Sequence, residues 1–371
     1  MSDKKLTILM LVTKRQYRGA EISAYNLSKT LVEKGHKVIW VGLYSFEGEN
    51  PLNLEGSINV DLPDSKFWLS YRKLKTLAKL YSKYSPDIVQ ANGSDTLRYL
   101  VFLKLLGFRY KIIYRNISII SKWINTKPKY FLFKYLFNKT DLVISVGEES
   151  KNDLIQLFNY NNGKIKIIRR GVPDIQPMYD NVSLIKKQFN ISEDDFVFIH
   201  IGHFSTEKNH SFLIDVWEKL QSENNNIKLV MLGDGILKDS IVSKIETKNL
   251  KNSIILPGLQ KNIYDWIAIS KVNLLCSTVE GVPGVVIETS LIGIPTIAVD
   301  VGGVREVLTD GENGILISSH DEEKFRKACE SLIQNRSILN QFSVNARQLV
   351  AQKYDLEANT NEFINTYYSL L

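Results

Sequence analysis

Short runs of β-branched and other apolar residues alternate with amphipathic stretches of helical length along the whole chain. Such runs predict strands that are buried on both faces, and the stretches between them predict the crossover helices of a parallel sheet. The first series of predicted strands lies near 6–12, 37–42, 87–91, 111–115, 142–146 and 165–168. The second series lies near 196–201, 227–232, 253–256, 272–276, 295–299 and 314–317. The pattern therefore predicts an α/β fold with two doubly wound, Rossmann-like parallel sheets.

The segment GVPDIQPMYDN at 171–181 separates the two series, and its Pro, Gly and Asp residues indicate a linker. We expect an N-terminal domain at 1–175, onto which a C-terminal helix at about 355–371 packs back, and a second domain at 185–354. The two domains are expected to face each other across a cleft. Ligands of such sheets bind beyond the carboxyl ends of the strands.

No apolar run approaches the roughly 18 to 20 residues that span a bilayer, so no transmembrane helix is expected. The N-terminus, MSDKK, leads directly into a predicted strand without a small-residue cleavage site, which favours a cytoplasmic protein. Cys276 and Cys329 lack the spacing of a metal or redox site, and we expect both to pack in the core.

The formal charge of +7 is unevenly distributed along the chain. Residues 1–180 hold 29 Lys and Arg against 16 Asp and Glu, whereas residues 181–371 hold 18 against 24. A basic half joined to an acidic half indicates that one domain meets an anionic surface. Nucleic acid, anionic lipid and a phosphorylated acceptor all fit this description.

The most informative segment is STVEGVPGVVIETSLIGIPTIAV at 277–299. It leaves a predicted strand, turns through Pro283 and Gly284, and enters a predicted helix. The first amides of that helix, such as those of Val285 and Val286, have no partner within the helix and point along the positive end of its dipole. Phosphate binds well at such a position.

Two glutamates flank this turn. Glu280 precedes the helix and Glu288 lies inside it, so they are placed too differently to act as an acid and base pair on one bond. Each carboxylate offers two oxygens and suits the hydroxyls of a sugar. Spacing alone leaves open a simpler interpretation, in which Glu280 caps the helix and Glu288 is a solvated helix residue.

A second segment, IGHFSTEKNHSFLIDVW at 201–217, runs from a predicted strand through a polar loop into a helix that begins near Lys208. A lysine at a helix start is electrostatically unfavourable unless an anion lies beside it. Lys208 is therefore a candidate ligand of a diphosphate, with a solvated loop lysine as the alternative. The sequence leaves the roles of His203 and His210 open, because a histidine in a polar loop usually has no special role.

The N-terminal stretch at 13–42 predicts a loop, an amphipathic helix and a strand. Gly19 in that loop would let the backbone approach a ligand closely, although Gly-Ala-Glu is also a simple helix start. No GxGxxG follows the first predicted strand, which disfavours a dinucleotide-dependent dehydrogenase.

Taken together, these segments resemble glycosyltransferase family 4, the retaining enzymes of the GT-B fold, over almost the whole chain. EGVPGVVIE at 280–288 matches the family's form EG-x-P-x-x-x-x-E, and GIPTIAVDVGGVREVLTDGENGILI at 293–317 is similar to the stretch that follows it. GDG at 233–235 and PGLQKNI at 257–263 match the segments that lead to the nucleobase pocket.

The resemblance implies a role for each matching residue. Glu288 would hold the ribose hydroxyls, Glu280 the hydroxyls of the donor sugar, and Lys208 the diphosphate. No metal and no other cofactor is expected, and the mechanism implied is attack on the face of the sugar that the leaving phosphate occupies. The remaining donor-binding residues would be Pro283, Gly284, Val285 and Val286 at the helix start, Leu259 and Gln260 at the base, and Gly19 from the other domain.

The sequence departs from the family pattern in places. His203 and Phe204 follow Gly202 where Gly-Arg-Leu is common, so the second diphosphate cation is either missing or supplied by His203. Arg115 and Asn116 stand near the place of a histidine that often meets the donor sugar. Asn92 likewise stands where many relatives have histidine.

Lysines alternate with Trp, Tyr, Phe and Leu at 65–85 and 121–139, in the basic half. This composition is typical of helices that lie on an anionic membrane surface. Ordinary helices with aromatic residues on a sheet and lysines in water remain the alternative. We hypothesise peripheral attachment to the inner face of the plasma membrane, which vesicle co-sedimentation tests.

The sequence thus predicts a retaining glycosyltransferase that moves a sugar from a nucleotide-sugar donor to a glycan or lipid-linked acceptor. A nucleotide-sugar epimerase or a sugar phosphorylase on a similar fold is the alternative. A nucleic-acid-binding protein would not need the acidic half with its two glutamates and phosphate turn. The expected partners are therefore the donor, the acceptor and an anionic membrane surface, without nucleic acid.

Overall fold

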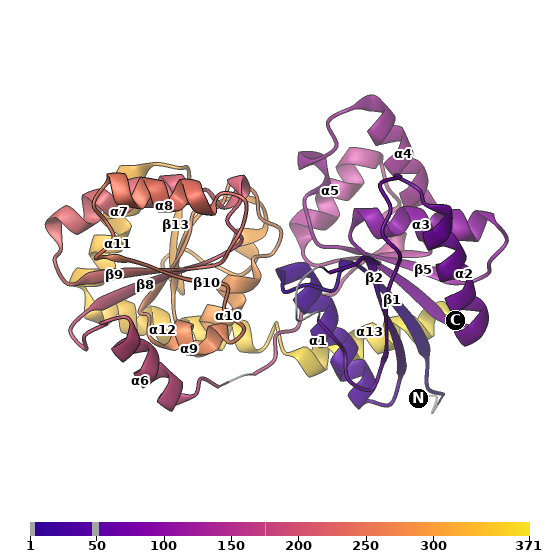
Figure 1. The fold of residues 1–371 in the computed structure, drawn as a ribbon, viewed down its shortest axis with the longest axis horizontal. Coiled ribbons are helices and arrows are strands. Elements are labelled where there is room, and N and C mark those ends of the chain that lie inside the picture. The colour runs from indigo at the N-terminus through magenta and orange to yellow at the C-terminus, as the bar shows by residue number, and fades with distance from the viewer. Residues whose placement is uncertain (1–3, 47–51, 175) are drawn as a thin grey trace. The chain divides into compact units, whose positions relative to one another are not determined.

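The computed structural model describes residues 4–46, 52–174 and 176–371 (Figure 1). The chain forms two compact units: unit 1 comprises Met1–Pro173 and Tyr354–Leu371, and unit 2 comprises Asp174–Lys353. Each unit is a doubly wound parallel α/β fold, as the alternation of apolar runs and amphipathic stretches predicts. None of the described helices is long and apolar enough to cross a membrane.

Unit 1 is built on a parallel sheet whose described strands lie in the order β3-β2-β1-β4-β5-β6-β7. Its strands are β1 (Thr7–Lys14), β2 (Lys37–Tyr44), β3 (Ile58–Asp61), β4 (Ile88–Asn92), β5 (Lys111–Asn116), β6 (Leu142–Ser145) and β7 (Ile165–Ile167). Every strand of the first predicted series is present. The additional edge strand, β3, is too short and too polar for the pattern to have indicated it.

Helices cover both faces of this sheet. On one face, α1 (Gly19–Glu33) and the C-terminal helix α13 (Leu356–Leu370) pack against each other and share a core with the sheet (Figure 1). The other face carries α2 (Tyr71–Tyr84), α3 (Ser94–Leu105), α4 (Lys127–Asn138) and α5 (Glu148–Phe158). The end of the chain therefore belongs to unit 1.

Unit 2 contains a second parallel sheet, whose described strands lie in the order β10-β9-β8-β11-β12-β13. The strands are β8 (Phe196–Ile201), β9 (Ile227–Leu232), β10 (Ile254–Gly258), β11 (Val272–Leu275), β12 (Thr296–Val299) and β13 (Gly314–Ile317). The helices are α6 (Tyr179–Gln188), α7 (His210–Glu223), α8 (Lys238–Thr247), α9 (Ile263–Ala268), α10 (Gly284–Ile292), α11 (Glu322–Gln334) and α12 (Arg336–Ala351).

Helix α6 begins inside the segment expected to be a linker. Its apolar residues Val182 and Ile185, with Phe189 just beyond its end, pack on the core that α9 shares with the sheet. The rings of Phe189 and Trp266 meet edge to face at 5.2 Å. Unit 2 therefore starts well before residue 185, where the sequence placed the second domain.

The strand order of unit 2 contains a reversal. The chain passes from β8 outward to β9 and β10, and then returns to place β11 on the other side of β8. Ligands of open parallel sheets bind at such a reversal, beyond the carboxyl ends of the two strands. The loops that follow β8 and β11 are thus adjacent, and these loops carry Lys208 and Glu280.

Candidate active site

Lys208 ends a short 3₁₀ turn, η3 (Thr206–Lys208), that follows β8. Asn209 then adopts the left-handed conformation with φ of 52°, and α7 begins at His210. Asparagine is one of the few residues other than glycine that tolerates this region. The helix therefore starts two residues later than predicted, and the lysine lies on the turn in front of it.

The side chains of Lys208 and Glu280 form an ion pair. Lys208 Nζ donates to Glu280 Oε1 at 2.5 Å, and Ser277 Oγ donates to the same oxygen at 2.6 Å. The side chain of Glu280 is 10% exposed and that of Lys208 is 22% exposed, so the pair is largely shielded from water. The anion beside Lys208 is thus Glu280.

Several hydrogen bonds hold the two loops together. The thiol of Cys276 lies 3.3 Å from the carbonyl oxygen of Lys208, and the amide of Thr278 donates to the carbonyl of Glu207 at 2.8 Å. Burial raises the pKa of Cys276 to about 12, so the thiol stays protonated and donates. His320 Nε2 lies 3.0 Å from the carbonyl of Cys276. Cys276 therefore packs in the core as expected and also supports the turn that carries Lys208.

The start of α10 has the form that an anion site needs. Its N-cap is Pro283, which provides no side-chain hydrogen bond to the first turn. The amides of Gly284, Val285 and Val286 therefore lack an intrahelical acceptor. Glu280 does not cap this helix, so the simpler interpretation of that residue is wrong. Glu288 lies one turn inside the helix and is partly buried.

Two glycine pairs allow the site loops to approach neighbouring backbone. A Cβ on Gly303, in the turn η4 (Gly302–Glu306), would lie 2.5 Å from the carbonyl oxygen of Gly281. A Cβ on Gly233 would lie 1.9 Å from the carbonyl oxygen of Gly202. Both glycines belong to segments that resemble the family in sequence, at 233–235 and 293–317. They thus let these segments support the loops after β8 and β11.

Beneath the loop after β8 lie two buried histidines. The rings of His200 and His210 meet edge to face at 4.8 Å, and His200 Nδ1 lies 2.8 Å from the carbonyl of Leu274. Burial lowers the pKa of His200 to about 4 and that of His210 to about 2, so both are neutral near pH 7. His203 lies in the same loop and is partly buried.

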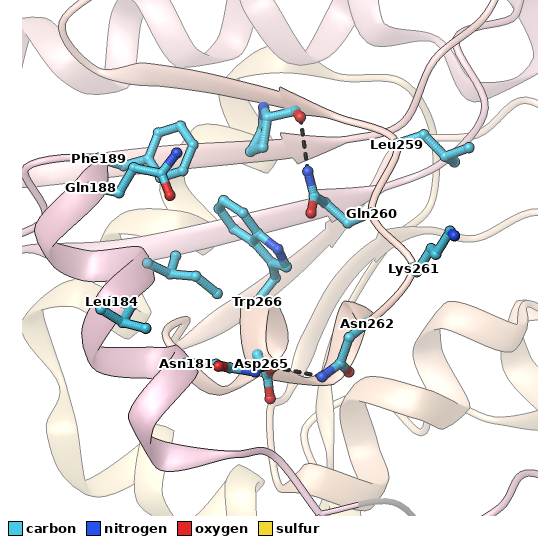
Figure 2. Close-up of a pocket in the computed structure, with 12 residues that line it drawn as sticks. Asn181, Leu184, Gln188, Phe189, Leu259, Gln260, Lys261, Asn262, Asp265 and Trp266 are labelled. Carbon is cyan, nitrogen blue, oxygen red and sulfur yellow. Dashed lines mark hydrogen bonds between the residues drawn. The ribbon is translucent and has the colours of Figure 1, made fainter.

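A pocket of about 540 Å³ lies beside the loop after β10 (Figure 2). Leu259 and Gln260, the predicted base-pocket residues, belong to its lining, whereas Lys208 and Glu280 do not. The Gln260 amide donates to the carbonyl of Pro257 at 2.9 Å, and the side chain of Leu259 is 62% exposed. Figure 2 shows Trp266 between this loop and α6, a position that the sequence did not indicate.

The remaining predicted residue, Gly19, begins α1 in unit 1 and is exposed. In the same unit, Arg115 is 1% exposed at the carboxyl end of β5 and donates to Ser23 Oγ at 2.8 Å. Burial lowers the pKa of Arg115 to about 10. Asn92 and Asn116 are also buried at strand ends. Gly19 has a negative φ, and a Cβ there would touch nothing within 4 Å.

Ser277, which contacts Glu280, is a further site residue that the sequence did not indicate. It lies within the quoted segment 277–299, three residues before Glu280, and its hydroxyl is the only sign of its role. Within residues 4–46, 52–174 and 176–371, no group of three or more His, Cys, Asp or Glu is placed to hold a metal ion.

Comparison with known proteins gives the following matches. The family described as Glycosyltransferase Family 4 matches residues 17–174, and the family described as Glycosyl transferases group 1 matches residues 181–349. An uncharacterized glycosyltransferase of Methanocaldococcus jannaschii is 30% identical over 247 residues, which span 62% of this chain and 60% of that protein.

Two further matches cover more of the chain. The N-acetylgalactosamine-N,N'-diacetylbacillosaminyl-diphospho-undecaprenol 4-alpha-N-acetylgalactosaminyltransferase of Campylobacter jejuni is 25% identical over 293 residues, spanning 75% of this chain and 77% of that protein. The crystal structure of Anabaena HepE in complex with UDP and glucose superposes with a TM-score of 0.86 at 20% identity, covering 98% of this chain and 100% of that one. This likeness shows the GT-B fold.

Proposed function

The chain belongs to glycosyltransferase family 4, and on this premise we propose that it transfers a sugar from a nucleotide-sugar donor to a glycan or lipid-linked acceptor with retention of configuration. One observation carries the proposal for the donor site. Lys208 and Glu280 meet at the strand reversal of unit 2, and the loop that carries Glu280 leads to the uncapped start of α10. A diphosphate and a sugar suit these groups.

In the proposed complex, the amides of Gly284, Val285 and Val286 and the ammonium of Lys208 contact the diphosphate. Glu280 accepts hydrogen bonds from the sugar hydroxyls, and Glu288 accepts them from the ribose. The cation and the helix dipole stabilise negative charge as it develops on the leaving group, so that no metal ion is required. The nucleobase lies beside Leu259 and Gln260.

The proposed reaction forms one bond and breaks one bond at the anomeric carbon. The oxygen of an acceptor hydroxyl attacks this carbon while the bond to the diphosphate oxygen breaks, and the leaving phosphate takes the proton of that hydroxyl. The products are a glycoside and a nucleoside diphosphate. Attack from the face that the leaving group occupies preserves the configuration.

The choice of acceptor is supported by the named relative from Campylobacter jejuni, which acts on a diphospho-undecaprenol compound. Unit 1 also has the composition of a surface for anionic lipid. Residues 65–86 and 96–140 contain no Asp or Glu, and the second stretch holds ten Lys and Arg. These stretches include most of α2, α3 and α4, which pack side by side on one face of the sheet (Figure 1).

Exposed apolar side chains accompany these charges. Leu371 aside, the exposed large apolar side chains in the described part of unit 1 all lie on or beside these three helices: Phe67, Trp68, Tyr71, Phe102, Leu105, Leu106, Phe131 and Tyr135. Cations together with apolar and aromatic anchors favour an anionic membrane interface. These apolar side chains, together with the Lys and Arg residues of 65–86 and 96–140, are here called the basic aromatic face. We propose that this face brings the enzyme to its acceptor at the membrane.

The donor proposal is tested by incubating the purified protein with UDP-glucose, UDP-N-acetylglucosamine, UDP-N-acetylgalactosamine or GDP-mannose. Undecaprenyl diphosphate carrying a single sugar serves as the acceptor. We expect one donor to yield a glycosylated lipid and a nucleoside diphosphate. NMR of the product should show the same anomeric configuration as in the donor. Inverted product would refute retention. An epimerised nucleotide sugar, or a sugar 1-phosphate formed with inorganic phosphate, would instead favour an epimerase or a phosphorylase.

A further inference from the structure

Both hydrogen bonds to Glu280 end on the same oxygen. Lys208 Nζ and Ser277 Oγ both donate to Oε1, at 2.5 and 2.6 Å. Among the described residues, no hydrogen bond reaches Oε2, and this atom is not one of the buried polar atoms that lack a partner. The carboxylate is therefore held by one oxygen while the other remains open to a ligand.

In the proposed donor complex, the Lys208 ammonium and the Ser277 hydroxyl would behave differently. The ammonium of Lys208 would have to turn from Glu280 toward the incoming diphosphate, because a dianionic group attracts it more strongly than one carboxylate. The hydroxyl of Ser277 makes no hydrogen bond other than that to Glu280 among the described residues, and it carries no charge that a diphosphate would attract. Ser277 is 1% exposed and lies three residues before Glu280 on the same loop. It would then be the protein donor that still orients the carboxylate.

We propose that Ser277 is a positioning residue that holds Glu280 Oε1 while Lys208 moves to the diphosphate, so that Oε2 faces the donor sugar. The inference rests on the proposed function, since it assigns a second residue to the same site. Ser277 touches no substrate in this arrangement. Its effect on sugar recognition passes entirely through Glu280.

This role predicts a separation between two ligands. UDP has the diphosphate but no sugar, whereas UDP-glucose and the other nucleotide sugars carry the hydroxyls that Glu280 would accept. Loss of the serine hydroxyl should therefore weaken the binding of the nucleotide sugar and leave the binding of UDP, or of GDP if guanosine is preferred, unchanged. A serine that only stabilises the loop would affect both ligands alike.

The experiment compares Ser277→Ala and Ser277→Cys with a matched control, Ser290→Ala. Ser290 is a fully buried serine on α10, and its hydroxyl has no hydrogen-bond partner among the described residues. Cysteine has the same shape with a slightly larger atom and a weaker donor, which protects the test if the alanine variant folds poorly. Isothermal titration measures the affinity for the preferred nucleoside diphosphate and for its nucleotide sugar, and thermal unfolding checks the fold.

We expect Ser277→Ala to weaken nucleotide-sugar affinity about 10-fold, as for one hydrogen bond to a charged group, with Ser277→Cys in between. Affinity for the nucleoside diphosphate should change less than about 2-fold, and Ser290→Ala should match the wild type for both ligands. Equal losses for both ligands, or no loss for either, would overturn the inference while the wild-type enzyme remains active. A wild type that binds none of the nucleotide sugars would instead refute the proposed function.

Discussion

The carbonyl oxygen of Glu280 occupies the space that a side chain on residue 302 would need. A Cβ on Gly302 would lie 1.9 Å from that oxygen, and Gly302 has a φ of +52°. The glycine thus permits the turn η4 to lie directly against the backbone of the glutamate. This contact connects the loop after β12 to the residue that we propose for sugar recognition.

Replacing Gly302 with alanine should displace the Glu280 loop. We expect Gly302→Ala to lower the free energy of unfolding by more than about 2 kcal/mol, since a backbone clash adds to the cost of a left-handed alanine. Affinity for the nucleotide sugar should also fall. Gly311→Ala is the control, because Gly311 also has a positive φ of 73° but a Cβ there would touch nothing within 4 Å. If denaturant titrations show the same loss of unfolding free energy in both variants, the predicted clash at residue 302 is wrong.

Removal of the Lys208 ammonium should mainly affect the chemical step. We expect Lys208→Met to reduce kcat/KM about 100-fold or more, as for the loss of one charge that stabilises a leaving group. The comparison is Lys219→Met, which breaks the more exposed ion pair between Lys219, near the end of α7, and Glu322, at the start of α11. Steady-state kinetics that show similar, small effects in the two variants would exclude the proposed role of Lys208.

The proposed role of Glu288 makes a prediction about the ribose. Wild-type protein should bind UDP more tightly than 2′-deoxy-UDP, because one hydroxyl is missing from the second ligand, provided that uridine is the base. Glu288→Gln should weaken UDP binding about 10-fold and reduce the difference between the two ligands. Titration calorimetry measures both quantities. If Glu288→Gln prefers UDP over 2′-deoxy-UDP as strongly as the wild type does, Glu288 does not bind the ribose.

The buried histidines should make the protein less stable in mild acid. The pKa of His200 is lowered to about 4 by burial, against an ordinary value of 6.5. Between these values the unfolded chain binds a proton that the folded chain does not, so stability falls as the pH drops from about 6.5 toward 4. From pH 7 to pH 5, His200 should account for about 2 kcal/mol of lost unfolding free energy. His200→Gln should flatten this dependence in urea titrations, and an unchanged slope would contradict it.

Charge and aromatic residues on the basic aromatic face should both be needed for vesicle binding. We expect Lys134→Glu and Phe131→Ser each to reduce co-sedimentation with vesicles of phosphatidylglycerol and phosphatidylcholine at low salt. Tyr179→Ser, at a side chain of unit 2 that is 80% exposed, is the control. Wild-type protein that stays in the supernatant, or that binds single-stranded RNA instead, would refute the membrane proposal.

Much of the fold could be predicted from local pattern. Alternation of apolar runs and amphipathic stretches indicated both parallel sheets, because side-chain periodicity reflects the burial of each element separately. The exceptions were β3, whose four residues carry too little pattern, and α6, whose start overlaps Pro- and Asp-rich residues. Glu280, Lys208 and the Pro283 turn could be identified as candidates because each stands next to the end of a predicted strand.

The sequence by itself determined the order of strands along the chain, the family and the residue types at the candidate site. Only the tertiary structure decided that Lys208, Ser277 and Glu280 form one group, and that Gly302 lies against it. The physical reason is the strand order of the second sheet. β11 lies beside β8 although β9 and β10 intervene in the chain. Lys208 and Glu280 are 72 residues apart, and this separation gives no indication that they are in contact.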